Sequence, residues 1–152
     1  MKRYEYPEDY AIGEKIVSPA RTINEADIVN FAMITGDWYA GHIDKEFAAK
    51  TVFGQRFAHG MLTLTLGSAC LMWLGPSAYV PTSFIAFVGL DTIRITKPTF
   101  IGDTIHAEAT VASVKPISKG RAILTFNCEI INQRKEVLIT YSHSVMCTQK
   151  PQ

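Results

Sequence analysis

The sequence predicts a single α+β domain, residues 1–152, in which a curved antiparallel sheet wraps around one long central helix. Two observations carry this prediction. Residues 60–74 are apolar nearly all round, and the chain after Pro81 alternates apolar and polar residues with the period of two that is typical of strands. A length of 152 residues is usual for one domain and is sufficient to bury a core.

Two helices are expected before the long one. Asn24 can cap the first, with Asp27 at the third helical position returning the contact, and Gly36 ends it. Asp44 can cap a short second helix that runs to Lys50. The segment between these helices is too rich in glycine and aromatic residues to continue a helix.

The long helix is expected over residues 60–74, because Gly75 and Pro76 stop it. Its polar residues are small, namely Thr63, Thr65 and Ser68. Such a composition is typical of a helix that is enclosed on every side. We therefore expect this helix to be central and buried along most of its length.

Four strands are expected in the second half, and short turns between them favour antiparallel meander connections. Their approximate ranges are 83–96, 103–115, 121–132 and 136–147. An earlier strand near Ile16 would complete the sheet. His106 and His143 fall within these strands, and we expect both on the solvated face.

Composition limits the partners and the location of the protein. The net charge is +1 with dispersed lysines and arginines, which argues against nucleic acid and against a membrane surface as partners. The N-terminus lacks an apolar signal-like region, and the longest apolar run is shorter than a bilayer span. Cys70, Cys128 and Cys147 are far apart and lie in apolar patterns, so we interpret them as reduced core thiols of a cytoplasmic protein.

Asp37 and His42 are the first candidates for chemistry. They are five residues apart in a loop that can fold both side chains towards one point. A carboxylate beside an imidazole is a usable acid/base pair near neutral pH, because the imidazole exchanges a proton while the carboxylate orients it or a water. The alternative is that Asp37 caps the next turn and that His42 is a surface histidine.

His59 and Gly60 stand at the entrance of the long helix, where unpaired N–H groups and the positive end of the helix dipole can hold an oxyanion. Gly60 has no side chain, so a ligand carbonyl can approach its N–H, although glycine is also an ordinary residue at a helix start. Ser68 follows two turns later. Its hydroxyl needs a partner, and a carbonyl one turn back is the simple alternative.

A metal site formed by Asp37, His42, Asp44 and His59 is a further alternative. No pair among them has the helical histidine spacing that presents two ligands together, so we expect no metal. Phosphate-binding loops, a nucleophile elbow and Rossmann glycines are absent from the sequence, which excludes most nucleotide-binding and serine-hydrolase classes.

The same residues resemble the MaoC-like family of (R)-specific enoyl-CoA hydratases and dehydratases, which have the hot-dog fold. The family signature has the form FAxxSGDxNPxHxDxxFA followed by HGM. Here residues 31–48 read FAMITGDWYAGHIDKEFA, and HGM stands at 59–61. A Lys-Pro and a Gly-Asp-Thr passage at 97–98 and 102–104 extend the resemblance over the whole chain.

The resemblance implies roles for individual residues. Asp37 and His42 match the catalytic dyad, Gly60 matches the glycine whose N–H binds the thioester carbonyl, and Ser68 matches a serine that supports the dyad. The sequence departs from the family at Tyr39, which with Ala40 replaces Asn-Pro. The remaining residues that we expect around the substrate pocket are Trp38, Tyr39, His59 and Met61. For Tyr39 the alternative is that it packs on the loop or across the dimer interface.

The expected function is the reversible hydration of a 2-enoyl-CoA to a 3-hydroxyacyl-CoA by a homodimer, without metal or redox cofactor. Water must be activated at C3, a proton placed at C2, and the enolate-like charge on the carbonyl oxygen stabilised. Two alternatives stay open: a catalytically weak acyl-CoA-binding protein, which the Tyr39 change motivates, and an acyl-CoA thioesterase on the same fold.

Overall fold

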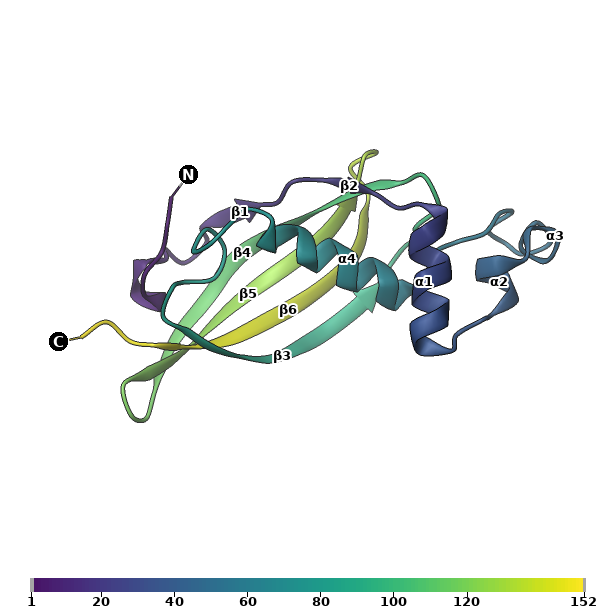
Figure 1. Cartoon of the computed structure of the whole chain (residues 1–152). Helices are drawn as coiled ribbons and strands as arrows, with labels where there is room; N and C mark the ends of the chain where they lie inside the picture. Colours follow the sequence, from purple (N-terminus) through teal and green to yellow (C-terminus); the bar gives the residue numbers. More distant parts are fainter. Residues whose placement is uncertain (1, 152) are drawn as a thin grey trace.

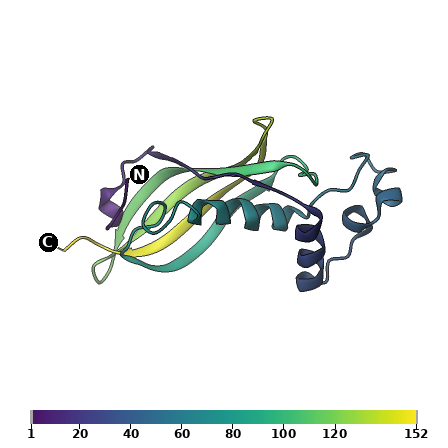
Figure 2. The same ribbon diagram turned by 45° about the horizontal axis from the view of Figure 1, so that its top comes forward.

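The computed structural model describes residues 2–151, in which six strands form one antiparallel sheet with helix α4 lying along its concave face (Figures 1 and 2). The strand order is β1-β4-β5-β6-β3, and β2 pairs with β4. The helices are the 3₁₀ helix Pro7–Asp9, α1 (Glu25–Thr35), α2 (Ala40–Ile43), α3 (Lys45–Ala48) and α4 (Gly60–Met72). The strands are β1 (Lys15–Val17), β2 (Arg21–Thr22), β3 (Phe84–Ile95), β4 (Thr104–Ile117), β5 (Arg121–Asn132) and β6 (Val137–Thr148).

Local capping positions α1 as expected. The Asp27 carboxylate accepts a hydrogen bond of 2.9 Å from the N–H of Asn24, which satisfies one of the unpaired donors at the helix start. Gly36 ends the helix with φ 76°, a left-handed conformation that glycine adopts readily. The Asp44 side chain caps α3 by accepting from Phe47 N–H at 3.0 Å. This helix ends at Ala48, two residues earlier than the expected Lys50.

Helix α4 ends at Met72 and buries one face against the sheet. The opposite face is exposed at Met61 (52%), Thr65 and Met72 (47%). The expectation that this helix is enclosed on every side is therefore wrong for the single chain. These residues recur every four to seven positions, so the helical period places them on the side away from the sheet.

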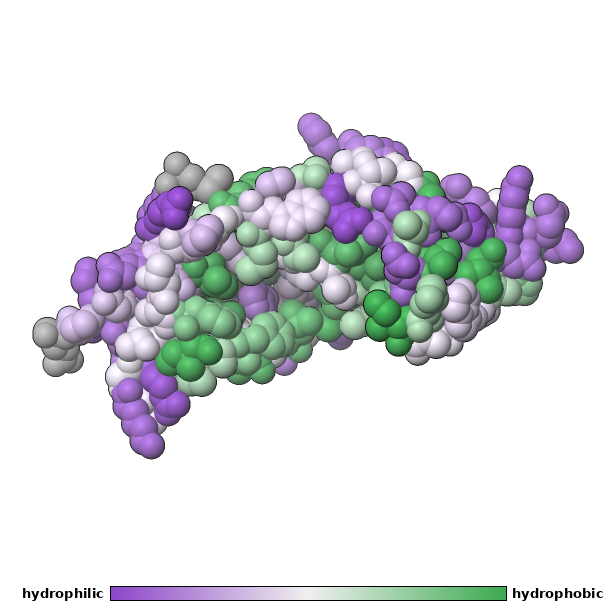
Figure 3. All heavy atoms as spheres, viewed as in Figure 1, coloured by the Kyte–Doolittle hydropathy of each residue, from purple (hydrophilic) through white to green (hydrophobic). Residues whose placement is uncertain are grey.

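Strand β3 is an edge strand whose one partner among the described residues is β6. It exposes a row of large apolar side chains, visible in Figure 3 as the green band along the lower edge of the molecule. Its exposed members are Phe84, Ile85, Phe87, Val88 and Ile95. A long apolar edge of this kind is unusual unless another chain covers it.

The expectation for His143 is wrong: this side chain is 9% exposed and hydrogen-bonds to Tyr79. It shares its strand parity with Tyr141 and Val145, which also point into the core. His106 is partly exposed, as expected for the outer face.

The three cysteines are buried and unpaired, as the sequence predicts. Among residues 2–151, no helix has the length and apolar character needed to cross a bilayer.

Candidate active site

The segment between α1 and α4 brings two histidines and a carboxylate together. Asp37 follows the left-handed Gly36, His42 lies on α2, and His59 immediately precedes α4. One carboxylate oxygen of Asp37 and one ring nitrogen of each histidine lie within 4.8 Å of one another. Asp37 is exposed, whereas His42 and His59 are 7% and 3% exposed. The structure thus brings the sequence-predicted pair into one cluster.

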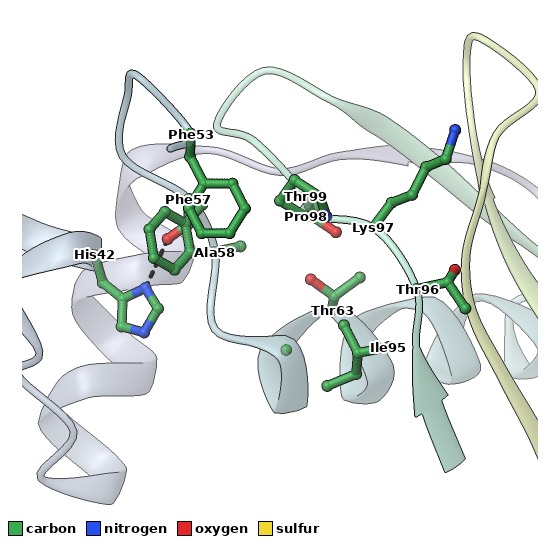
Figure 4. A pocket seen from close by; sticks show the side chains of 11 residues that line it. His42, Phe53, Phe57, Ala58, Thr63, Ile95, Thr96, Lys97, Pro98 and Thr99 are labelled. Carbon is green, nitrogen blue, oxygen red and sulfur yellow. Dashed lines mark hydrogen bonds between the residues drawn. The ribbon is translucent and has the colours of Figure 1, made fainter. Parts of the chain in front are cut away.

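A hydrogen bond to the backbone fixes the tautomer of His42. Its Nδ1 lies 2.7 Å from the carbonyl oxygen of Phe57, which can only accept, so Nδ1 carries the proton (Figure 4). In the neutral ring, Nε2 then has a free lone pair. Burial lowers the pKa of His42 below its ordinary value and outweighs the Phe57 hydrogen bond, which raises it. His42 is therefore suited to accept a proton near neutral pH.

His59 holds the loop that carries Asp37. Its Nε2 donates to the backbone carbonyl of Asp37 at 3.0 Å, and its ring lies 3.8 Å from that of His42, centroid to centroid. The Nδ1 atom of His59 is buried and has no hydrogen-bond partner within residues 2–151. His59 thus packs against one member of the pair and bonds the backbone of the other.

Gly60 begins α4 next to this cluster. The first N–H groups of a helix have no partner within it and are available to a ligand. Gly60 lines two cavities that also include His42, and it has no side chain to fill them; a Cβ here would lie 2.3 Å from Cδ1 of Ile95. The position therefore leaves room for a carbonyl oxygen at the positive end of the helix.

Two cavities meet at His42 and Gly60. The first, of about 290 Å³, is lined by Phe53 and Phe57 near His42 and has Lys97 on the opposite side (Figure 4). The second, of about 550 Å³, contains Asp37, His42 and His59. The pair and the helix start are therefore reachable from two directions.

Ser68 does not join the cluster in this chain. Its hydroxyl donates to the carbonyl of Thr65 at 3.1 Å, which is the simple alternative that the sequence left open. Eight residues of helix separate it from Gly60, about 12 Å at the usual rise. Ser68 instead lines a third cavity of about 310 Å³ farther along α4.

The other residues expected around the substrate pocket occupy different places. Met61 lines the second and third cavities, whereas Trp38 and Tyr39 line none of the three. The Tyr39 ring packs edge-on against the rings of His42 and Phe47, with centroids 5.5 and 5.8 Å apart. The Tyr39 ring therefore lies beside His42, and its place around the substrate pocket stays a prediction.

The cluster also has the composition of a metal site, since a carboxylate and two imidazoles are ordinary zinc ligands. These residues lack the helical spacing of paired metal ligands, but loops bring three of them together without it. Of the four expected candidates, Asp44 is outside the cluster and caps α3.

Two residues that matter to the site carried no sequence signal. The carbonyl of Phe57 sets the tautomer of His42, and Ile95 packs against Gly60 from the sheet. A backbone carbonyl can belong to any residue, so no composition or spacing could have singled out Phe57.

The chain is similar to one known family over most of its length. A family model described as "MaoC like domain" matches residues 8–137. The chain belongs to the MaoC-like family. An (R)-specific enoyl-CoA hydratase from Rhodospirillum rubrum is 38% identical to this MaoC-like chain over 117 residues, 75% of this chain and 74% of that protein. Protein MaoC from Klebsiella aerogenes is 35% identical over 105 residues, 69% of this chain, and the match spans only 30% of that longer protein.

Solved structures resemble the MaoC-like chain equally broadly. A monoamine oxidase regulatory protein from Archaeoglobus has a TM-score of 0.91 and 38% identity, with 99% of this chain and 98% of that chain covered. A Mycobacterium tuberculosis protein described as having a double hot-dog fold has a TM-score of 0.76 at 15% identity, with 97% of this chain and 45% of that chain covered. The predicted hot-dog fold is confirmed.

Proposed function

We propose that this MaoC-like chain reversibly hydrates a 2-enoyl-CoA to a 3-hydroxyacyl-CoA. The observation that carries the proposal is the placement of a neutral His42, with Nε2 free to accept a proton, beside the Asp37 carboxylate and the first N–H groups of α4. The names of relatives support it: besides the Rhodospirillum hydratase, a 3-hydroxybutyryl-CoA dehydratase from Methylorubrum extorquens is 34% identical over 125 residues.

In this proposal each group has one task. Asp37 holds the water by accepting one of its protons in a hydrogen bond, and His42 Nε2 takes the other proton as the oxygen attacks C3. The electrons of the C2–C3 double bond move towards the thioester carbonyl, whose oxygen gains charge next to Gly60 N–H and the dipole of α4. The proton on His42 is then delivered to C2, which completes the addition of water and restores the neutral imidazole.

We further propose that the reaction needs neither a metal nor a redox cofactor, since addition of water changes no net oxidation state of the substrate and both proton-handling groups are present. Activity should survive dialysis against a chelator and should not rise when zinc is added. A loss on chelation that zinc restores would instead assign the Asp37, His42 and His59 cluster to a metal.

A homodimer is the assembly that we propose. The apolar edge of β3 and the exposed stripe of α4 at Met61, Thr65 and Met72 both need cover. A second copy placed edge to edge along β3 would extend the sheet and shield these side chains at once. The cytoplasmic location stays a prediction.

Incubating the protein with crotonyl-CoA tests the function and separates its rivals. Loss of the enoyl absorbance without release of thiol is the expected result. Release of free CoA thiol would make the protein a thioesterase, and binding without either change would make it an acyl-CoA-binding protein. The last two outcomes each contradict the proposal.

A further inference from the structure

The third cavity continues the one that holds the dyad. It lies between α4 and strands β3 and β6, and it shares Met61 and Thr65 with the cavity that contains Asp37 and His42. The two cavities therefore adjoin, and together we call them the α4 trough, which starts at Gly60 and runs towards Met72. Most of the side chains along its far part are apolar, and these include Leu64, Ala69, Met72, Phe87 and Leu90.

If the proposed function holds, the thioester carbonyl binds at Gly60, and this position indicates which part of the substrate enters the trough. A thioester has two arms, the acyl tail and the pantetheine chain, which leave its carbonyl in different directions. With the carbonyl at Gly60, one arm enters the α4 trough and the other enters the cavity bordered by Phe53 and Lys97. The apolar wall of the trough suits the acyl tail.

Besides Thr65, Ser68 and Tyr141, a hydrogen-bonded polar pair interrupts this apolar wall. Tyr79 and His143, which are 2% and 9% exposed, both line the trough, and the Tyr79 hydroxyl is hydrogen-bonded to Nδ1 of His143. The Cys128 thiol also lies near the Tyr79 hydroxyl, but sulfur is a weak acceptor, so we assign the hydroxyl proton to the hydrogen bond with Nδ1 of His143. This arrangement leaves the ring proton of His143 on Nε2.

The Nε2–H of His143 is a donor without an assigned acceptor. It has no hydrogen-bond partner within the described part of the chain, and the ring is flanked by Phe87, with centroids 5.2 Å apart. Burial lowers the pKa of His143 to about 4, so the ring is neutral at pH 7. A neutral donor in an apolar wall suits a neutral oxygen, because a buried carboxylate facing it would lack a compensating charge.

The register of β3 and β6 shows how far this donor lies from Gly60 along the trough. Ile95, which packs against Gly60, pairs with Ile139, whereas Leu90 in the trough wall pairs with His143. Ile139 and His143 are four residues apart on β6, which is about 13 Å along a strand. A short acyl tail such as crotonyl cannot reach His143, but a medium-length tail can.

We propose that the α4 trough selects a medium-length acyl tail that carries a carbonyl or hydroxyl oxygen near its far end, and that His143 Nε2–H donates a hydrogen bond to this oxygen. The natural substrate is then an oxygenated medium-chain 2-enoyl thioester. A plain hydrocarbon tail would leave this buried donor without a hydrogen-bond partner. That cost lowers the affinity for the plain tail relative to the oxygenated one.

Binding of unreactive saturated thioesters tests this without depending on catalysis. We expect octanoyl-CoA with a ketone on its penultimate carbon to bind at least about tenfold more tightly than plain octanoyl-CoA in calorimetric titrations. Equal affinities for the two, or tighter binding of the plain chain, would overturn the inference. Hydration of crotonyl-CoA, measured alongside, reports on the proposed function alone, because this tail does not reach His143.

Variants at the donor make the test specific. His143→Phe should abolish the preference for the ketone. His143→Gln should retain part of it, because an amide N–H can replace the donor. Tyr79→Phe should weaken the preference, because the ring proton of His143 is then no longer held on Nε2. Ser142→Ala, next to His143 but outside the trough, is the matched control and should keep the full preference. A preference that persists in a folded His143→Phe would contradict the role of His143, and the wild-type comparison stands even if that variant does not fold.

Discussion

The hydrogen bond from His42 to the Phe57 carbonyl determines which ring nitrogen is free to act as a base. Asp37 and His42 act on one water in the proposed mechanism, so they work as a unit. His42→Ala should lower kcat for hydration by at least about 100-fold, the range typical of a lost general base.

The double variant Asp37→Asn/His42→Ala should hydrate the substrate only slightly more slowly than the slower single variant. The reason is that removing either residue already disables the pair. Initial rates of enoyl absorbance loss for the four proteins measure this. Losses that multiply would show that the two residues act independently and would contradict the paired role.

His143 predicts a dependence of stability on pH. Burial lowers its folded-state pKa from 6.5 to about 4, so the unfolded chain binds the proton more readily between these values. Stability should therefore be complete above pH 6.5 and fall as the pH decreases towards 4, by up to on the order of 3 kcal/mol.

Urea unfolding at pH 7 and at pH 4.5 measures this difference. His143→Gln, which cannot titrate, should lose distinctly less stability over the same interval, whatever its stability at pH 7. An identical loss in both proteins would mean that other groups, such as carboxylates, account for the acid sensitivity.

Single residues differed in how far the sequence could place them. The order and spacing of residues 31–61 identified Asp37, His42 and Gly60, which the structure gathers around two adjoining cavities. The direction of Tyr39 could not be predicted, because the direction of a loop side chain depends on backbone dihedral angles, which composition does not specify. The prediction for His143 is wrong because alternation shows which residues share a face but not which of the two faces is buried; in the structure His143 shares the buried face with Tyr141.

At the scale of elements, two glycines of α4 should differ in how well the fold tolerates their replacement by alanine. A Cβ at Gly67 would lie 2.5 to 2.8 Å from three atoms of Ile130, which is completely buried, whereas one at Gly60 would meet mainly the mobile end of the exposed Ile95. Gly67→Ala should therefore destabilise the fold by about 1–3 kcal/mol through overpacking.

Gly60→Ala should leave the free energy of unfolding nearly unchanged and yet reduce hydration, because Gly60 lines both cavities and a methyl group would take up space beside its N–H. Urea unfolding and initial rates of the two variants check both effects. The result that contradicts this account is a Gly60→Ala protein that is stable and fully active.

The bounds of helices and strands were easier to predict than what covers each of their faces. Strand β5 has the predicted bounds, and α1 begins and ends at its predicted caps, because alternation and capping are local properties. The exposed side of α4 was not foreseen. An apolar helix surface indicates that something covers it, but the sequence cannot say whether that cover is the same chain or a second one.

At the scale of the whole molecule, the free edge of β3 predicts association. The wild-type protein should sediment as a dimer at micromolar concentration, and Val88→Lys, at a 52% exposed position of β3, should shift it towards monomer by placing a charge in an apolar contact. Val52→Lys, at a 95% exposed position outside β3, is the matched control and should stay dimeric. A monomeric wild-type protein would refute the proposed assembly.

The central claim is that the Asp37 carboxylate takes part in adding water to a 2-enoyl thioester. The most direct measurement compares initial hydration rates of wild type, Asp37→Asn and Asp44→Asn on one enoyl-CoA. Asp44 is an acid of the same segment whose capping role asparagine can fulfil, so Asp44→Asn controls for the loss of charge. We expect a loss of at least about 100-fold in the hydration rate for Asp37→Asn and near-normal turnover for Asp44→Asn. A folded Asp37→Asn protein that retains most of the wild-type rate would contradict the account.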